Sequence, residues 1–159
     1  MSRPNLLRKA VAAAIVASVA AAGCTRIDRR IFEGLVRQSK SIEDQVPAKV
    51  DLARYRDLVN GMSDELAGAT ARAHTRGERA VLAEYDTALT GLKDILAVWE
   101  AKDRSRSDLL PIRDAMPARI AREYNLAVNT NEPPSIYASE AMQAIWATTK
   151  PRLEAAAAH

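Results

Sequence analysis

The clearest pattern of hydrophobic positions lies between residues 52 and 73. Apolar side chains recur there at alternating intervals of three and four residues: Leu52, Tyr55, Val59, Met62, Leu66, Ala69 and Ala73. On an α-helix this spacing forms one continuous stripe, so the pattern predicts a helix of about 25 residues packed against a neighbouring helix. Gly61 and Gly68 lie beside the stripe, where they suit either close approach of that neighbour or chance.

A second stripe with the same spacing follows, out of phase with the first. Its members and the residues that widen it are Leu82, Tyr85, Leu89, Leu92, Leu96 and Trp99, with Val81, Ala88 and Ile95. Between the stripes, Thr75 and Glu78 match a capping box, in which each side chain binds a free backbone N–H at a helix start. The sequence therefore predicts a turn at residues 74–78 between two antiparallel helices of matching length. The wide second stripe indicates more than one neighbour for the second helix.

Weaker patterns predict a helix on either side of this hairpin. The first covers residues 25–45, and a boundary is expected at 46–50 because Pro47 lacks a backbone N–H. After a polar loop at residues 102–108, a loose apolar stripe predicts a helix that ends near Val128. Several local features accompany this last prediction: a cap by Ser107 or Asp108, Pro111 in the first turn, and at Pro117 either a kink or a division into two short helices.

The C-terminal part predicts one more helix. A loop over residues 129–134 is indicated by its Asn and Pro residues. A helix capped by Ser135 or Ser139 then follows, and Pro151 is expected to kink or fray it. Because convincing strand alternation is missing, we expect an all-α fold, an antiparallel up-and-down bundle of about four to five helices. Such periodic helices can also pair between two chains rather than within one.

The first 24 residues have a different pattern. Three basic residues precede an uncharged apolar run over residues 10–22, and small residues then lead to Gly23 and Cys24, the only cysteine. A basic start, an apolar run of this length and small residues before a cut are typical of a secretory signal, whereas a spanning helix needs about 20 apolar residues. The stretch resembles a bacterial lipoprotein signal peptide, with Ala21 where that family usually has Leu.

This resemblance implies that the Cys24 sulfur receives a diacylglycerol, that cleavage falls between Gly23 and Cys24, and that the new amine is acylated. Residues 1–23 are then the signal peptide, and residues 24–159 are a single periplasmic domain anchored by lipid. If the host is Gram-negative, Thr25 in place of a retaining Asp implies the outer membrane. A plain cleaved signal and an uncleaved anchor are the alternatives.

Loss of the signal peptide also changes the charge of the protein. The full chain has 23 basic and 20 acidic residues, and the predicted mature chain has 20 of each. Net charge therefore gives no argument for nucleic-acid binding, and seven aromatic residues offer little stacking surface. Residues 25–45 keep a local basic excess, which suits either anionic headgroups beside the anchor or an ordinary solvated helix face.

Side chains that could carry chemistry are few. His159 ends the chain, and His74 with Glu78 supplies only two of the ligands that a zinc site needs, so a solvated turn histidine is the simpler interpretation. The six glycines are scattered rather than gathered in a phosphate loop. Four carboxylates are expected to solvate an outer helix face: Glu84, Asp86, Asp94 and Glu100. We therefore expect no enzyme, no metal and no cofactor.

The sequence thus predicts an envelope lipoprotein whose bundle acts as a non-catalytic protein-interaction or structural module. Its expected contacts are the membrane, through Cys24, and another envelope protein, with no nucleic acid. The alternative is a sensory or transport bundle that binds a small molecule or lipid in a cavity near Tyr55, Tyr85 and Trp99. At stripe positions, these three side chains equally suit packing in the core.

Overall fold

Helices form most of the computed structural model, which describes residues 27–45 and 50–159. In chain order its elements are η1 (Arg29–Phe32), α1 (Glu33–Gln45), α2 (Leu52–Arg72), α3 (Arg76–Ser105), β1 (Leu109–Pro111), α4 (Ala115–Glu123), β2 (Ser135–Tyr137) and α5 (Ala138–Ala157). Here η1 is a short 3-10 helix. The predicted all-α bundle is confirmed, with one small two-stranded sheet added.

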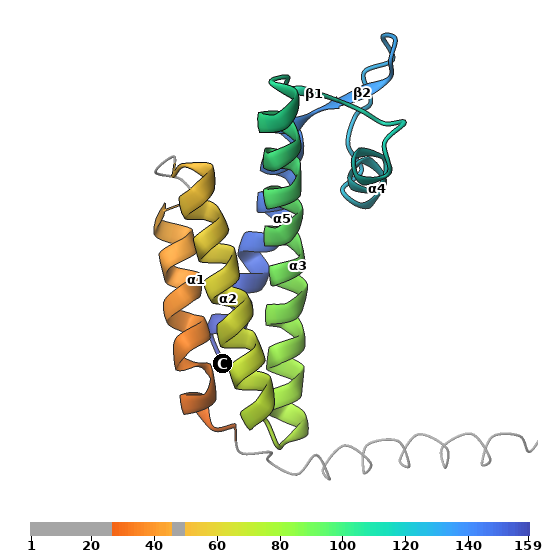
Figure 1. Cartoon of the computed structure of the whole chain (residues 1–159). Helices are drawn as coiled ribbons and strands as arrows, with labels where there is room; N and C mark the ends of the chain where they lie inside the picture. The colour runs from red at the N-terminus through yellow and green to blue at the C-terminus, as the bar shows by residue number, and fades with distance from the viewer. Residues whose placement is uncertain (1–26, 46–49) are drawn as a thin grey trace, which may run out of the picture.

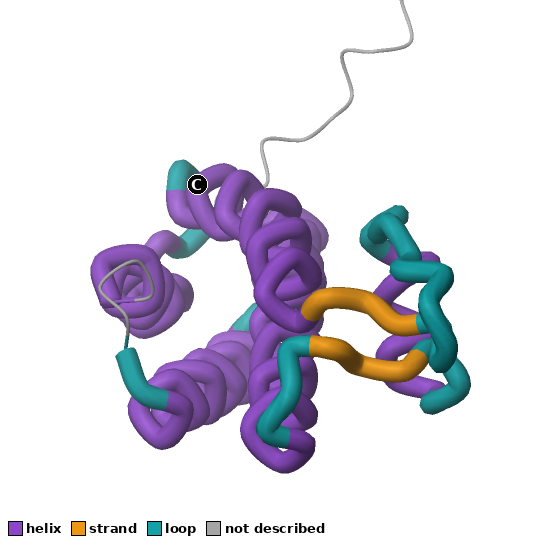
Figure 2. The backbone as a smooth tube through the Cα atoms, turned by 90° about the horizontal axis from the view of Figure 1, so that it is seen from above, coloured by secondary structure: helices purple, strands orange, loops and turns teal. Residues whose placement is uncertain are grey.

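Four helices make the bundle, and each runs opposite to the one before it (Figure 1). Helix α1 contacts α2 and α5, and α3 also contacts α2 and α5, so the four close around a shared core (Figure 2). The two predicted helices of the hairpin are present as α2 and α3, but the prediction that their lengths match is wrong, since α2 has 21 residues and α3 has 30. Together with the start of α5, the extra length of α3 carries β1 and β2 beyond the ends of α1 and α2, and α4 lies to the side of α3 (Figure 1).

The core is built from the two strong stripes. Tyr55, Val59 and Met62 of α2 are buried, and so are Tyr85 and Leu92 of α3. Burial of such side chains is the main favourable term in folding. Twelve buried hydrophobic residues of the other helices and the sheet complete this cluster, and they extend from η1 to the end of α5.

One close contact between helices is marked by a glycine that the sequence analysis did not single out. A methyl group at Gly91 of α3 would collide with the hydroxyl of Thr149 in α5. At Gly61, a Cβ would lie 2.8 Å from the side-chain nitrogen of Gln38, whereas Gly68 faces open space. The prediction that a neighbouring helix approaches closely is therefore correct at Gly61 and wrong at Gly68.

The predicted turn and its capping box are confirmed at the start of α3. The Glu78 carboxylate accepts hydrogen bonds from the backbone N–H groups of Thr75 and His74, both at 2.9 Å, and of Asp28 at 3.2 Å. The carboxylate therefore joins η1 to the α2–α3 turn. These three backbone donors stabilise the charged form and hold the pKa of Glu78 at about 2.

This low pKa predicts how stability depends on pH. Because folding lowers the pKa of Glu78 from 4.5 to about 2, its contribution is complete above pH 4.5 and is lost as the pH falls towards 2. We expect Glu78→Gln to be less stable than the wild type at pH 7 and to lose less stability between pH 5 and pH 2. Urea unfolding across this pH range measures both effects. Asp86→Asn, at an exposed position of the same helix, is the control, and equal pH dependence in all three proteins would contradict the role of Glu78.

The segment after α3 differs from its prediction. The expected helix from residue 109, capped by Ser107 or Asp108, is wrong because β1 pairs antiparallel with β2 there. Helix α4 is short and begins only at Ala115. The predicted kink or pair of short helices at Pro117 is also wrong, because the proline is the third residue of α4, where an N–H has no partner within the helix.

The start of α5 is capped from a distant part of the chain. Tyr137 occupies the capping position without a side-chain bond, so the predicted caps Ser135 and Ser139 are wrong. Instead the Asp108 carboxylate accepts bonds from the Ser139 backbone N–H at 3.2 Å and from its hydroxyl at 2.6 Å. An anion at this helix end is favourable because free N–H groups and the helix dipole meet there.

Two further predictions concern the ends of helices. Helix α5 continues through Pro151 to Ala157, and Ala156 is buried, so the predicted frayed end is wrong, whereas the kink at Pro151 stays a prediction. The predicted boundary at residues 46–50 agrees with the end of α1 at Gln45 and the start of α2 at Leu52. Pro47 itself lies outside the described residues.

Candidate interaction surface

The feature that distinguishes this molecule from a plain bundle lies between α3 and α5. Residues 107–137 contain β1, α4, β2 and their loops, and we call them the tip module. Both views show this module beside the end of the bundle rather than within the ring of four helices (Figures 1 and 2). Leu110 of β1 and Ile136 of β2 are directly paired and buried, which attaches the sheet to the hydrophobic core.

A polar cluster attaches α4 to α3. Asp94 of α3 is only 5% exposed, and its carboxylate accepts a hydrogen bond of 2.8 Å from the hydroxyl of Tyr124. It also forms an ion pair with the guanidinium of Arg119, which reaches Glu123 at 2.6 Å. The prediction that Asp94 solvates an outer face is therefore wrong. The hydrogen bond to Asp94 is the main cause that raises the pKa of Arg119. The pKa of Tyr124 is raised mainly by burial and, to a smaller extent, by the hydrogen bond to Asp94.

The outer face of the small sheet is apolar. Leu109 and Tyr137 are opposite each other in the register and point away from the Leu110–Ile136 pair, since successive side chains of a strand alternate in direction. Leu109 is 40% exposed and Tyr137 is 39% exposed. We call these two residues the tip pair. Cross-strand neighbours with open apolar surface are suited to packing against another molecule.

A third exposed apolar residue lies on the adjoining loop. Val128 is 37% exposed, and its neighbour Asn129 donates a 3.3 Å hydrogen bond to the hydroxyl of Tyr137. Asn129 also pairs with Ser135 through two backbone hydrogen bonds. In the part of the chain that the structure describes, the large apolar residues that are more than a third exposed are these three, and all belong to the tip module.

The free edge of β1 is closed to another strand. Hydrogen bonds from Ile112 and Ala138 show that the even-numbered positions of β1 and its flanks face β2, so Leu109 and Pro111 face the free edge. The Leu109 N–H donates to the Ser107 hydroxyl at 3.0 Å, and Pro111 has no N–H. Strand addition would find no free donor at these two positions, and the available surface is the face that carries the tip pair.

The three residues predicted to line a ligand cavity do not form one group. The rings of Tyr55 and Trp99 lie 5.7 Å apart at an angle of 38°, and the Tyr55 hydroxyl donates to the carbonyl oxygen of Leu92. Tyr85 is fully buried, and burial raises its pKa to about 12. It precedes Trp99 by 14 positions on α3, or roughly 21 Å along the axis. Ligand binding at these residues stays a prediction.

The other candidate residues are distributed as follows. Gly23 and Cys24 lie outside the described residues. His74 donates its backbone N–H to Glu78, and no group of three His, Cys, Asp or Glu residues in the described ranges could hold a metal ion. Glu84 and Asp86 are exposed, as predicted, and Glu100 is half-buried in an ion pair. Within the same ranges, no helix combines the length and apolar character needed to cross a bilayer.

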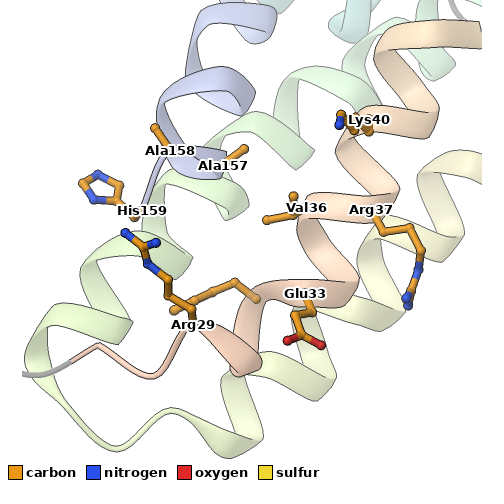
Figure 3. Close-up of a pocket in the computed structure, with 9 residues that line it drawn as sticks. Arg29, Glu33, Val36, Arg37, Lys40, Ala157, Ala158 and His159 are labelled. Atoms are coloured by element: carbon orange, nitrogen blue, oxygen red, sulfur yellow. The ribbon is translucent and has the colours of Figure 1, made fainter.

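A hollow of about 420 Å³ lies near the other end of the bundle, between α1 and the C-terminus (Figure 3). Apolar groups of Phe32, Val36 and Ala157 line it, and basic side chains border it from Arg29 and Lys40. The labelled side chains of Arg29 and His159 lie close together there (Figure 3). A site with this lining combines an apolar floor with positive charge.

No protein-family model matches this chain, and no curated protein or solved structure shows significant similarity to it. The class that the structure defines is a four-helix bundle with a tip module inserted between its last two helices.

Proposed function

We propose that this protein is an envelope lipoprotein, anchored by acylated Cys24, whose tip module binds another envelope protein without catalysing a reaction. The observation that carries this proposal is the grouping of exposed Leu109, Val128 and Tyr137 on one small module. Solvated surfaces carry scattered apolar side chains, but a rigid group of them is typical of a binding site. Tyrosine is also enriched among the residues that dominate binding energy.

The position of the module supports the same proposal. Residues 27–32 and the α2–α3 turn lie at one end of the bundle, and the tip module lies at the other (Figure 1). Helix α3 joins the two ends with 30 residues, which corresponds to roughly 45 Å. An anchor at Cys24 would therefore hold one end at the membrane and present the tip pair well away from it.

The anchoring of the sheet and α4 gives the surface a fixed shape. Leu110 and Ile136 join the core, Asp108 caps α5, and Asp94 holds α4 through Arg119. A surface held in one conformation loses little entropy when it binds a partner.

The experiment is site-specific photo-crosslinking in intact cells of the native host. A photoreactive residue at position 137 is expected to give one discrete crosslinked product with another protein, since this side chain belongs to the tip pair. The matched control places it at position 86, an exposed site in the middle of α3. No product from position 137, a product equally strong from position 86, or crosslinks only to a second copy of this chain would contradict the proposed heteromeric contact.

A further inference from the structure

The end of the bundle opposite the tip module gathers arginines from three elements. They are Arg29 and Arg30 of η1, Arg72 of α2, and Arg76 and Arg79 of α3, and we call this group the basic end. The elements are in contact, because the Arg72 guanidinium donates to the carbonyl oxygen of Ile31 and Glu78 binds the backbone N–H of Asp28. A hollow of about 430 Å³ is lined jointly by Arg30, Arg72 and His74.

Four carboxylate groups lie in the same region, and none of them forms an ion pair with these arginines. Glu78 is buried and occupied by three backbone N–H groups, whereas Asp28 and Glu33 are exposed and the C-terminal carboxylate of His159 lies nearby. Among the described residues, none of the five arginines has a carboxylate oxygen within 4.0 Å. By contrast, basic and acidic residues are equally frequent over residues 100–137, which include the tip module.

The chain length places the basic end close to the proposed anchor. Cys24 precedes Ile27, the first described residue, by three positions. At 3.8 Å between consecutive Cα atoms, the two residues can be no more than about 11 Å apart. This is close to the distance of about 8 Å over which physiological salt screens charges. The argument rests on the proposed acylation of Cys24, which would hold these arginines beside the lipid headgroups.

We propose that the basic end binds anionic phospholipid headgroups and thereby orients the bundle, with the tip module directed away from the bilayer. Guanidinium groups suit this role because they are always charged and bind phosphate oxygens through two N–H groups at once. Because the five arginines belong to three different elements, they can bind several headgroups at the same time. A lipid anchor alone would leave the tip module free to turn in any direction, whereas a second contact with the bilayer fixes its direction.

The test measures lipid binding without the anchor. The buried core extends from Ile31 to Ala156, so residues 25–159 contain all of it. We expect this soluble form to float with vesicles of phosphatidylglycerol and phosphatidylcholine much more strongly than with vesicles of phosphatidylcholine alone. Each arginine near an anionic surface strengthens membrane binding by about fivefold. The triple variant Arg29→Gln/Arg30→Gln/Arg76→Gln is therefore expected to bind these anionic vesicles at least about tenfold more weakly. Side chains of these three arginines make no hydrogen bond within the described residues.

The matched control removes the same charge from the other end. Arg104, Arg113 and Arg122 are exposed, and their joint replacement by Gln is expected to change flotation less than about twofold. Circular dichroism establishes that each variant is folded. Equal binding to both kinds of vesicle, or equal losses in the two triple variants, would overturn the proposal. Since this form lacks the lipid and needs no protein partner, its result is independent of Cys24 acylation and of the tip contact.

Discussion

The Cys24→Ala protein is expected to carry no lipid and to keep residues 1–23 attached. The reason is chemical, since alanine has no sulfur to accept the diacylglycerol on which the proposed processing depends. Mass spectrometry of the N-terminal peptide measures this directly. For the wild type, we expect a peptide that begins at Cys24 and carries acyl chains on both the sulfur and the amine, which together anchor a protein stably.

A neighbouring substitution supplies the control for this experiment. Thr25→Ala preserves the cysteine and the small residues before it, so it is expected to be cleaved and acylated like the wild type. A wild-type protein whose N-terminal peptide has a free Cys24 thiol would contradict the lipoprotein interpretation. An N-terminus elsewhere in the chain would contradict it as well.

The Asp94→Ala variant is expected to be less stable by about 2 kcal/mol. Removing the buried carboxylate leaves the Tyr124 hydroxyl and the Arg119 guanidinium without their partner on α3. Because Arg119 is partly open to solvent and keeps its ion pair with Glu123, the loss is smaller than for a fully buried pair. Urea unfolding measures the free energy of unfolding.

The same variant should loosen α4 more than the bundle. Hydrogen exchange is therefore expected to accelerate first over residues 115–123, because local opening follows the loss of local contacts. Asp86→Ala, at an exposed position of the same helix, is expected to change stability by less than about 0.5 kcal/mol. Equal stabilities of the two variants would show that Asp94 does not hold the tip module.

Local signals explain the parts of the fold that the sequence predicted well. The stripe from Leu52 to Ala73 needs only helical geometry, and the capping box of Thr75 and Glu78 involves residues three positions apart. Both patterns are complete within one segment of the chain. The helical bundle and the hairpin of α2 and α3 could therefore be predicted from the spacing of residues within each segment.

The tip module could not be predicted because its stabilising contacts join distant segments. Strand β1 has only three residues, and it forms a strand because it pairs with β2. The paired residues Leu110 and Ile136 are 26 positions apart in the sequence. Asp108 caps a helix 31 positions away. Without those partners, Leu109 and Ile112 resemble the start of an apolar helical stripe, and this caused the wrong prediction of a helix.

The candidate site was missed for the same reason. The exposure of Leu109 and Tyr137 follows from which face of the sheet meets the core, and the sequence gives no sign of a sheet. The prediction instead selected Tyr55, Tyr85 and Trp99, because aromatic residues on a stripe can line a cavity. Two of these residues are fully buried in the core, and the third packs against Tyr55.

The central claim is that an anchored bundle presents its tip module to a protein partner. The most direct measurement is chemical crosslinking in intact cells of the native host, followed by purification of the protein from membranes and identification of what is bound. We predict one specific partner for the wild type, lost in Cys24→Ala and in Leu109→Ser/Tyr137→Ser. An acylated, abundant protein that captures no partner, or captures the same partner after both tip substitutions, would contradict the account.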